Sequence, residues 1–214
     1  NPNLFFFRYN EKKINWDYSE TAYTFVLHHK KLTNNCARQF FLKDGPLAFL
    51  PISNTHTSIV WSVKNKSDAE KIILNDEARL NFLKMISVGF YEVIGCTNKL
   101  EKFDLTFEFL RRTALSRVIF MGDITHKIHP IAGQGWNMTL RDINILVSIL
   151  KEKLNKGYDI GDVGILKEYE KKTKASNLLF AMSIDLIRKA FRSQSPAISQ
   201  LRKKSFSIAS QPTV

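Results

Sequence analysis

The stretch Arg117–Asp142, RVIFMGDITHKIHPIAGQGWNMTLRD, decides the fold of this chain. It opens with the apolar run Val118–Met121, whose residue types favour a buried strand. From Trp136 onward, apolar residues recur at steps of three and four, which predicts a helix. The recurring positions are Met138, Leu140, Ile143, Leu146, Val147 and Leu150. The stretch therefore predicts a strand, a loop and a helix, in that order.

The loop in the middle of this stretch is built for close approach to a bound group. It contains Pro130, Gly133 and Gly135, and it follows Gly122, so its backbone can turn tightly. Backbone N–H groups of the first helical turn lack partners within the helix, and the helix dipole places about half a positive charge there. The loop therefore predicts a site for an anion or an electron-rich group.

Upstream of the stretch, apolar runs with turn residues between them predict a meander of antiparallel strands. These runs are residues 16–30, 36–50, 47–52 and 58–63, with a turn at Asp44–Pro46. Residues 67–95 then favour one or two helices, the first capped by Ser67. Asp104–Arg112 favours one more strand. The apolar burst Leu4–Phe7 is open to two interpretations, a strand or a packed loop.

Downstream, the periodicity predicts helices over residues 136–156 and 165–191, with a turn-rich break between them. Ser195 and Pro196 can start a last helix that reaches about Ala209. The expected fold class is therefore α+β, with an antiparallel sheet followed by the strand-loop-helix stretch and C-terminal helices.

The composition is that of a basic chain that can bury a core. The chain has 214 residues, of which 44% are hydrophobic, and a net charge of +12. Residues 151–214 carry thirteen Lys or Arg against six acids. This excess permits contact with nucleic acid or an anionic membrane, but it is also typical of a solvated helical surface, which we prefer. No apolar run approaches the ~18–20 residues of a membrane span.

The cysteines and histidines favour structural roles. Cys36 and Cys96 have no metal-like spacing and are expected to be buried free thiols. His126 and His129 could be drawn as a metal site with Asp123, but the loop and its proline argue against it, so no metal site is expected. His28 and His29 are expected as a surface pair, Trp61 as a core residue, and Arg141 with Asp142 as structural.

The segment Gly122–Asn137, GDITHKIHPIAGQGWN, resembles the second flavin-binding motif of the FAD-dependent aromatic-ring hydroxylases, with the family pattern GDAAHxxxPxxGQGxN. Within that superfamily the chain is most similar to the ubiquinone-biosynthesis hydroxylases. They share HPIAGQG, the following Arg141–Asp142, and an upstream block like Asp44–Pro51 leading to Ser58–Trp61. The C-terminal segment Tyr169–Ala175 also fits. The resemblance extends from about residue 16 to about residue 191.

This resemblance implies roles for individual residues. Asp123 would accept hydrogen bonds from FAD hydroxyls, Gly122 would leave room for them, and Pro130 would lie beside the isoalloxazine ring. The loop that would face the flavin N1–C2=O edge consists of Ala132, Gly133, Gln134, Gly135, Trp136 and Asn137. A helix N-terminus suits negative charge on the reduced flavin. No catalytic side chain is implied, because the cofactor carries the chemistry.

The sequence also departs from the family pattern. Ile124–Thr125 replaces an Ala-Ala pair, which is tolerable if Thr125 faces a backbone carbonyl, and Trp136 replaces a smaller apolar residue. No G-x-G-x-x-G opens a βαβ unit, which is the family's site for the ADP half of FAD. We therefore expect that unit to lie N-terminal to this sequence, and we expect this chain alone to bind FAD poorly and to be inactive.

The expectation for fold and domains is thus a truncated fold like that of para-hydroxybenzoate hydroxylase. Residues 1–112 would form a substrate-side sheet domain with covering helices. Residues 113–214 would form the C-terminal part of an FAD-binding domain with a helical tail.

The expected function is FAD-dependent hydroxylation of a polyprenyl phenol or quinol in ubiquinone synthesis, with O₂ as co-substrate and NAD(P)H as electron donor. Alternatives are hydroxylation of another aromatic substrate and a non-catalytic basic fragment that docks on a membrane or a protein. Peripheral membrane association or membership of a biosynthetic complex is expected, and nucleic acid is not an expected partner. The expected location is the bacterial cytoplasm or inner-membrane surface, or the matrix face in mitochondria.

Overall fold

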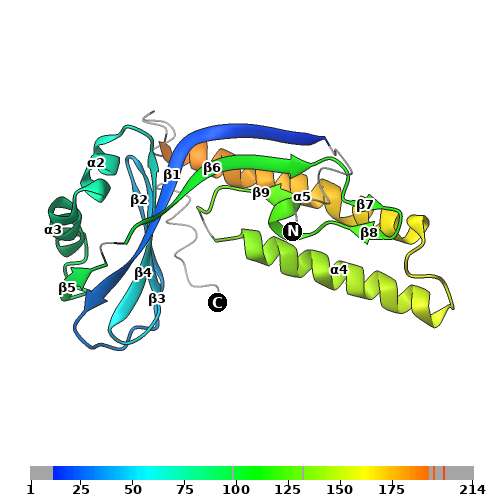
Figure 1. Ribbon diagram of the computed structural model, residues 1–214, viewed down its shortest axis with the longest axis horizontal. Coiled ribbons are helices and arrows are strands. Elements are labelled where there is room, and N and C mark those ends of the chain that lie inside the picture. The colour runs from blue at the N-terminus through cyan, green and yellow to red at the C-terminus, as the bar shows by residue number, and fades with distance from the viewer. Residues whose placement is uncertain (1–11, 98, 132, 193–194, 196–199, 201–214) are drawn as a thin grey trace. The chain divides into compact units, whose positions relative to one another are not determined.

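The computed structural model describes residues 12–97, 99–131, 133–192, 195 and 200 (Figure 1). The chain divides into two units. One unit comprises residues 18–105 and 190–214, and the other comprises residues 1–17 and 106–189. We call them the sheet unit and the helix unit. Leu4–Phe7 and most of the expected helix from Ser195 to Ala209 lie outside the described residues.

The sheet unit is built on an antiparallel meander, as predicted. Its strands are β1 (Lys13–His29), β2 (Arg38–Leu42), β3 (Gly45–Pro51), β4 (His56–Lys64) and β5 (Val93–Cys96). β2 pairs with β3, β3 with β4, and β4 with β1, all antiparallel. β5, which the sequence did not predict as a strand, pairs with the end of β1.

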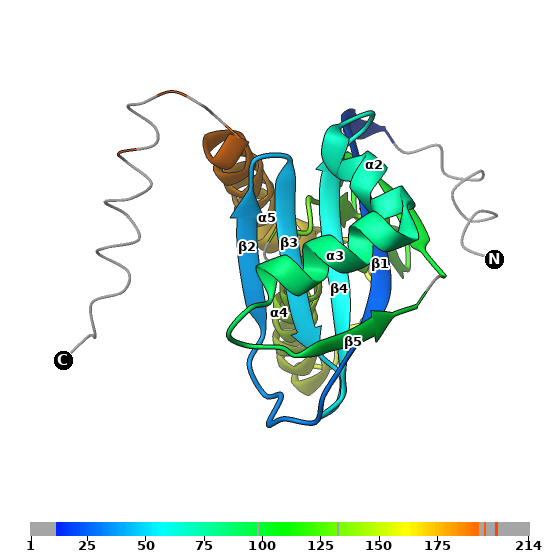
Figure 2. The same ribbon diagram turned by 90° about the vertical axis from the view of Figure 1, so that its left-hand side faces the viewer.

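One face of this sheet is covered by α2 (Asp68–Leu74) and α3 (Asp76–Ile86), which lie in front of β3 and β4 in Figure 2. Because alternate strand residues point to the same face, Phe25, Leu47 and Trp61 pack beneath these helices in one core. Trp61 is 1% exposed, so its predicted place in the core is confirmed. Ser67 accepts a hydrogen bond from the Glu70 backbone N–H, which confirms the predicted helix cap.

Strand alternation also explains an error in the histidine prediction. His28 is half-buried, but His29 is 1% exposed, and its Nε2 lies 3.1 Å from Thr57 Oγ1. Neighbouring residues of a strand point to opposite faces, so one of the two must face the helix-covered side. The prediction of buried thiols was wrong for Cys36, which is exposed, whereas Cys96 is half-buried; both are free.

The helix unit holds the strand-loop-helix stretch. Its elements are β6 (Glu101–Leu110), β7 (Ala114–Leu115), β8 (Val118–Ile119), the 3-10 turn η1 (Gly122–Ile124), β9 (His126–Lys127), α4 (Gly135–Asn155) and α5 (Val163–Arg192). β1 and β6 contribute residues to both units, and β9 pairs with β6. Ile149 of α4 packs with Ile165 and Tyr169 of α5 in the core of this unit.

The predicted buried strand Val118–Met121 was only partly correct. Only Val118 and Ile119 are paired, both are half-buried, and their partner is the short β7. Leu115 pairs with Val118 across a tight hairpin in which Arg117 has a φ of 59°. Phe120 is buried and its backbone N–H still donates to the carbonyl of Thr113 at 2.8 Å, whereas Met121 lies beyond the paired residues.

The two long helices agree with the sequence periodicity. The expected helices over residues 136–156 and 165–191 are α4 and α5, which begin and end within two residues of the expected positions. No helix in the described part of the chain combines the length and the apolar character needed to cross a membrane. An antiparallel sheet followed by helices confirms the predicted α+β class.

Candidate functional site

The candidate site lies in the helix unit, where η1 packs against the N-terminal part of α4. Gly122 has a φ of 72°, and a Cβ placed on it would lie 3.8 Å from the side chain of Thr139 of α4. This conformation favours glycine and allows the close approach of η1 to the helix. Asp123 is therefore held next to the first turns of α4.

Thr125 stabilises the turn that presents Asp123. It is 4% exposed, and both its backbone N–H and its hydroxyl donate to the carbonyl of Gly122, each at 2.8 Å. The condition under which threonine is tolerated here, a backbone carbonyl in front of its hydroxyl, is met. The turn is thus closed by two hydrogen bonds from one residue.

The carboxylate of Asp123 is available to a ligand. The side chain is exposed. Within the described residues it makes no hydrogen bond or ion pair. An ionised carboxylate accepts several hydrogen bonds, so it suits a ligand with hydroxyl groups.

The N-terminus of α4 presents free backbone donors. The N–H of Met138 donates to the carbonyl of Gln134 at 3.0 Å, so the three preceding N–H groups, those of Gly135, Trp136 and Asn137, fall before the helical ladder. Gln134 occupies the cap position without a capping side-chain hydrogen bond, and the first turn contains no acidic residue. This end of the helix therefore attracts negative charge.

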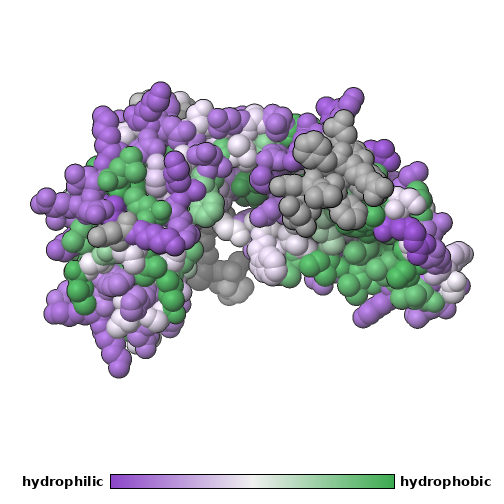
Figure 3. All heavy atoms as spheres, viewed as in Figure 1, coloured by the Kyte–Doolittle hydropathy of each residue, from purple (hydrophilic) through white to green (hydrophobic). Residues whose placement is uncertain are grey.

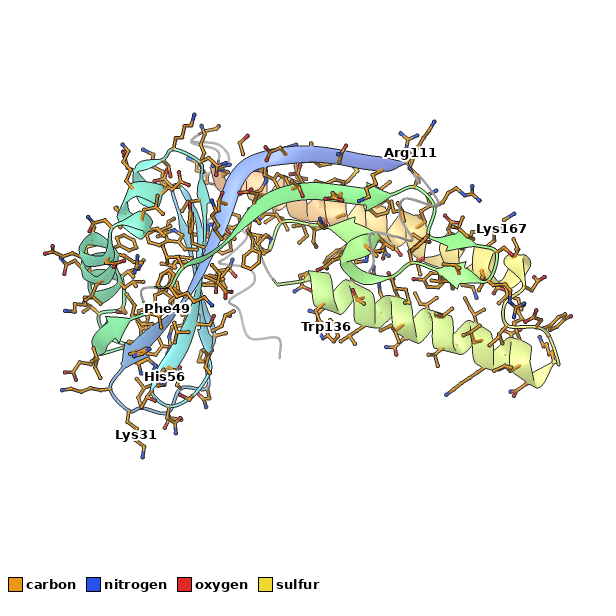
Figure 4. The ribbon with its side chains drawn as sticks, viewed as in Figure 1. Lys31, Phe49, His56, Arg111, Trp136 and Lys167 are labelled. Atoms are coloured by element: carbon orange, nitrogen blue, oxygen red, sulfur yellow. The ribbon has the colours of Figure 1, made fainter. Side chains whose placement is uncertain are left out.

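The loop before α4 leaves space for a bound group. Gly133 has a φ of 61°, and a Cβ added to Gly133 or Gly135 would meet no atom of the described residues within 4 Å. Pro130 is exposed, and Trp136 is 67% exposed at the first turn of the helix (Figure 4). Asn137 Nδ2 donates to Gln134 Oε1 at 3.0 Å. Ala132 lies outside the described residues.

A buried polar cluster, which the sequence did not reveal as a unit, lies in the same helix unit. Asp142 of α4 is 2% exposed, and its Oδ2 accepts a hydrogen bond from Asn177 Nδ2 of α5 at 2.7 Å. The same oxygen lies 3.5 Å from Nε2 of His126 of β9, which is also 2% exposed. Arg141 donates to Asn177 Oδ1. The structural role expected of Arg141 and Asp142 is confirmed.

The buried polar cluster lies close enough to Tyr169 to affect the pKa of its hydroxyl. Tyr169 is 1% exposed, and burial raises the pKa of its hydroxyl, with the nearby Asp142 carboxylate raising it further. The only sequence signal for the cluster is the polar pair Arg141–Asp142 inside an amphipathic helix. Asn177 lies 35 residues from Asp142 and carries no signal of its own.

The site residues fit a flavin better than a metal. Among the residues that the structure describes, no three His, Cys, Asp or Glu side chains gather as a metal site would require. The free donors at α4, the open space at Gly133 and Gly135, and the unpaired Asp123 carboxylate instead match a ligand with both an electron-rich edge and hydroxyl groups.

Comparison with protein families gives a match over most of the chain. The profile of a family described as "FAD binding domain" matches residues 15–177. The matched segment includes the described site from Gly122 to Asn137.

Curated relatives agree with this match. Ubiquinone biosynthesis monooxygenase COQ6 of Dictyostelium discoideum is 32% identical over 200 residues, which covers 79% of this chain and 40% of the relative. The human protein of that name is 27% identical over 228 residues, which covers 89% of this chain and 48% of the human protein. Ubiquinone hydroxylase UbiL of Rhodospirillum rubrum is 29% identical over 189 residues, which covers 87% of this chain and 43% of UbiL. The chain thus spans less than half the length of these relatives.

Solved structures share the fold. PqsL, described as a probable FAD-dependent monooxygenase from Pseudomonas aeruginosa, has a TM-score of 0.69 at 16% identity, covering 89% of this chain and 53% of PqsL. The p-nitrophenol 4-monooxygenase PnpA of Pseudomonas putida has a TM-score of 0.67 at 16% identity, and the likeness covers 94% of this chain and 51% of PnpA. The predicted fold class is confirmed by this likeness.

Proposed function

Because the chain belongs to the FAD binding domain family, we propose that it supplies the flavin-ring side of an FAD-dependent monooxygenase. The observation that carries this proposal is the pairing of Asp123 with the donor-rich start of α4, both inside the family match. The activity, substrate and partners below are proposals for the whole protein, because the curated relatives are more than twice as long.

The proposed roles divide the site in two. Asp123 accepts hydrogen bonds from hydroxyls of the FAD sugar-alcohol chain, and Gly122 keeps the approach open. Backbone N–H groups between Gly133 and Asn137 stabilise negative charge at the pyrimidine edge of the flavin ring, supported by the helix dipole. Pro130, Ala132, Gln134 and Trp136 are further proposed cofactor contacts. Bound FAD would supply the redox chemistry by which one oxygen atom of O₂ is transferred to the substrate and the other leaves as water, with NAD(P)H providing the two electrons.

We propose a polyprenyl phenol or quinol as substrate, with NAD(P)H as electron donor. Support comes from the names of the relatives, which refer to ubiquinone biosynthesis. The sheet unit adds physical support. On the face opposite α2 and α3, strand alternation places small, half-buried side chains, Thr24, Val26, Ala48 and Val60. Such a face suits one wall of an apolar pocket.

This function requires no acid or base from the chain, so we assign no catalytic side chain. The residues of the site position the cofactor, which supplies the chemistry. The relatives include proteins named as mitochondrial and one from a bacterium. We accordingly propose a location at the matrix face of the mitochondrial inner membrane or the inner face of a bacterial membrane.

The proposed function is tested with the protein expressed from the complete reading frame that contains this chain. It is incubated with FAD, NAD(P)H, a polyprenyl phenol and isotopically labelled dioxygen, and the product is analysed by mass spectrometry. We expect the product to carry one labelled oxygen atom, in a new hydroxyl group on the aromatic ring. Hydroxylation only of aromatic compounds without a polyprenyl tail would favour the alternative substrate class. Flavin binding without any hydroxylation would contradict the monooxygenase proposal.

A further inference from the structure

The outward face of α5 carries apolar side chains that the core of the helix unit does not use. Leu179 is 73% exposed, Met182 is 55% exposed and Leu186 is 67% exposed. Their spacing of three and four residues places them in one stripe along the helix. The inward face holds the buried residues of α5, among them Ile165, Leu166, Tyr169, Ala181 and Ile184. The stripe therefore needs an explanation other than packing within this unit.

Basic residues bracket this stripe. Lys171, Lys172 and Lys174 are exposed at one end of it and Lys189 at the other. From Lys171 to the end of the sequence the only acid is Asp185, which is 6% exposed and is paired with Arg188 and Lys189. Lys172 pairs with Glu168 and Lys189 with Asp185, so among the described residues Lys171 and Lys174 carry the unpaired positive charge beside the stripe.

An exposed apolar stripe also runs along α4, but it lacks this charge pattern. Figure 3 shows apolar residues gathered over α4, where Val147 is 41% exposed and Leu154 is 55% exposed. Glu152 lies beside this stripe and pairs with Lys156. Residues 171–192 of α5 carry six Lys or Arg against one acid, whereas α4 carries three against two, so the excess of positive charge distinguishes the α5 face.

We propose that the outward face of α5 docks on an anionic lipid surface. Amphipathic helices that lie in a membrane interface combine an apolar stripe with flanking lysines in this way. Each lysine gains from the negative potential of the surface, and the stripe gains from burial among acyl chains. The choice of a lipid surface rests in part on the proposed function, because a polyprenyl substrate lies in the bilayer.

This surface is tested by flotation with vesicles of phosphatidylcholine and phosphatidylglycerol, at low and high salt and without flavin or substrate. The test variant is Leu179→Ser with Leu186→Ser, which removes apolar area without changing the charge. The matched control is Val147→Ser with Leu154→Ser, two exposed α4 residues with the same seven-residue spacing. A second variant, Lys171→Gln with Lys174→Gln, removes two charges. Circular dichroism verifies that each variant is folded.

We expect the wild-type chain to float with mixed vesicles but only weakly with phosphatidylcholine alone. The α5 leucine variant should partition roughly tenfold less. The lysine variant should bind more weakly at low salt and show a smaller salt dependence than wild type. The control should bind like wild type.

Three outcomes would overturn the proposal. The α5 leucine variant could bind vesicles as strongly as wild type, or the α4 control could lose as much binding as the α5 leucine variant. Light scattering could also show a wild-type dimer that is absent in the α5 leucine variant. The last outcome would identify a second copy as the occupant. Because no flavin is present, the result is independent of the hydroxylation test.

Discussion

Asp142 shows how a single buried carboxylate can hold the flavin motif in place. It joins α4 to Asn177 of α5 and lies beside His126 of β9, directly after the turn that presents Asp123. Three elements of the helix unit, α4, α5 and β9, therefore meet at one side chain. Its second oxygen, Oδ1, has no hydrogen-bond partner among the described residues, so the cluster depends on the contacts of Oδ2.

Replacing Asp142 with alanine should destabilise the fold measurably. The change leaves the Asn177 amide buried without its acceptor, which costs about 1–3 kcal/mol. Asp142→Asn keeps an oxygen that can accept the same hydrogen bond and should cost less. Urea unfolding of the chain measures the free energy of unfolding of both variants. Equal stability of the alanine variant and the wild type would show that the cluster does not hold these elements together.

At the residue scale, sequence reasoning succeeded where a role depends on local neighbours. The carbonyl expected in front of Thr125 is that of Gly122, three residues away, and the motif itself placed Asp123 beside α4. It did not identify Asn177 as a partner, because that contact depends on how α5 packs on α4. The roles of Asp123 and Gly133–Asn137 as flavin contacts stay predictions.

At the scale of elements, the turn between β2 and β3 depends on Gly45. Its φ is 140°, and a Cβ on it would lie 2.0 Å from the carbonyl oxygen of Ser62 in β4. Gly45→Ala must therefore strain the backbone or move β4. We expect a loss of about 2 kcal/mol or more in the free energy of unfolding, measured with urea.

The matched control for this change is Gly95→Ala in β5. Within the part of the chain that the structure describes, a Cβ there would meet no atom within 4 Å, and Gly95 does not have a positive φ. This variant should unfold like wild type. If both glycine variants lost the same stability, the close approach at Ser62 would not be the cause.

Glu108 of β6 links three neighbouring strands and gives a pH-dependent prediction. It accepts hydrogen bonds from Lys13 of β1 at 2.7 Å and from Lys127 of β9 at 2.8 Å. Burial acts to raise the pKa of Glu108, but the two lysines outweigh it and hold the pKa below its ordinary value of 4.5. A lowered carboxyl pKa stabilises the fold above that ordinary value, and this contribution is lost as pH falls through the lowered pKa.

Glu108→Gln should therefore lower the free energy of unfolding by about 1 kcal/mol at neutral pH and by less in acid. Urea titrations at several pH values measure the difference. Glu101→Gln in the same strand is the control, because its partner Lys99 is 3.7 Å away and exposed, and no change is expected. A Glu108→Gln effect that is the same at every pH would contradict the ion-pair explanation.

The long elements could be predicted from the sequence and the short ones could not. The periodicity of α4 and α5 runs over many residues, so it outweighs local ambiguity. The elements β5, β7, β8 and β9 have two to four residues each and exist only because a partner strand lies beside them. Such pairings depend on tertiary contacts that no short pattern encodes.

At the scale of the whole molecule, the chain combines a helix-covered sheet with a strand-loop-helix site, and β1 and β6 contribute to both units. The expected functional domains, residues 1–112 and 113–214, stay a prediction. Composition revealed the basic C-terminal region, but only the structure showed which exposed apolar residues of α5 accompany its lysines.

We propose that the site around Asp123 and the start of α4 holds FAD. The most direct measurement is the FAD content and FAD dissociation constant of the protein expressed from the complete reading frame, compared with its Asp123→Ala and Asp68→Ala variants. Asp68 is an exposed acid of α2 and serves as the control. We expect Asp123→Ala to bind FAD about ten- to a hundredfold more weakly, because charge-assisted hydrogen bonds contribute about 1.5–3 kcal/mol, while Asp68→Ala binds like wild type. A folded Asp123→Ala variant that retained full FAD with unchanged affinity would contradict the claim.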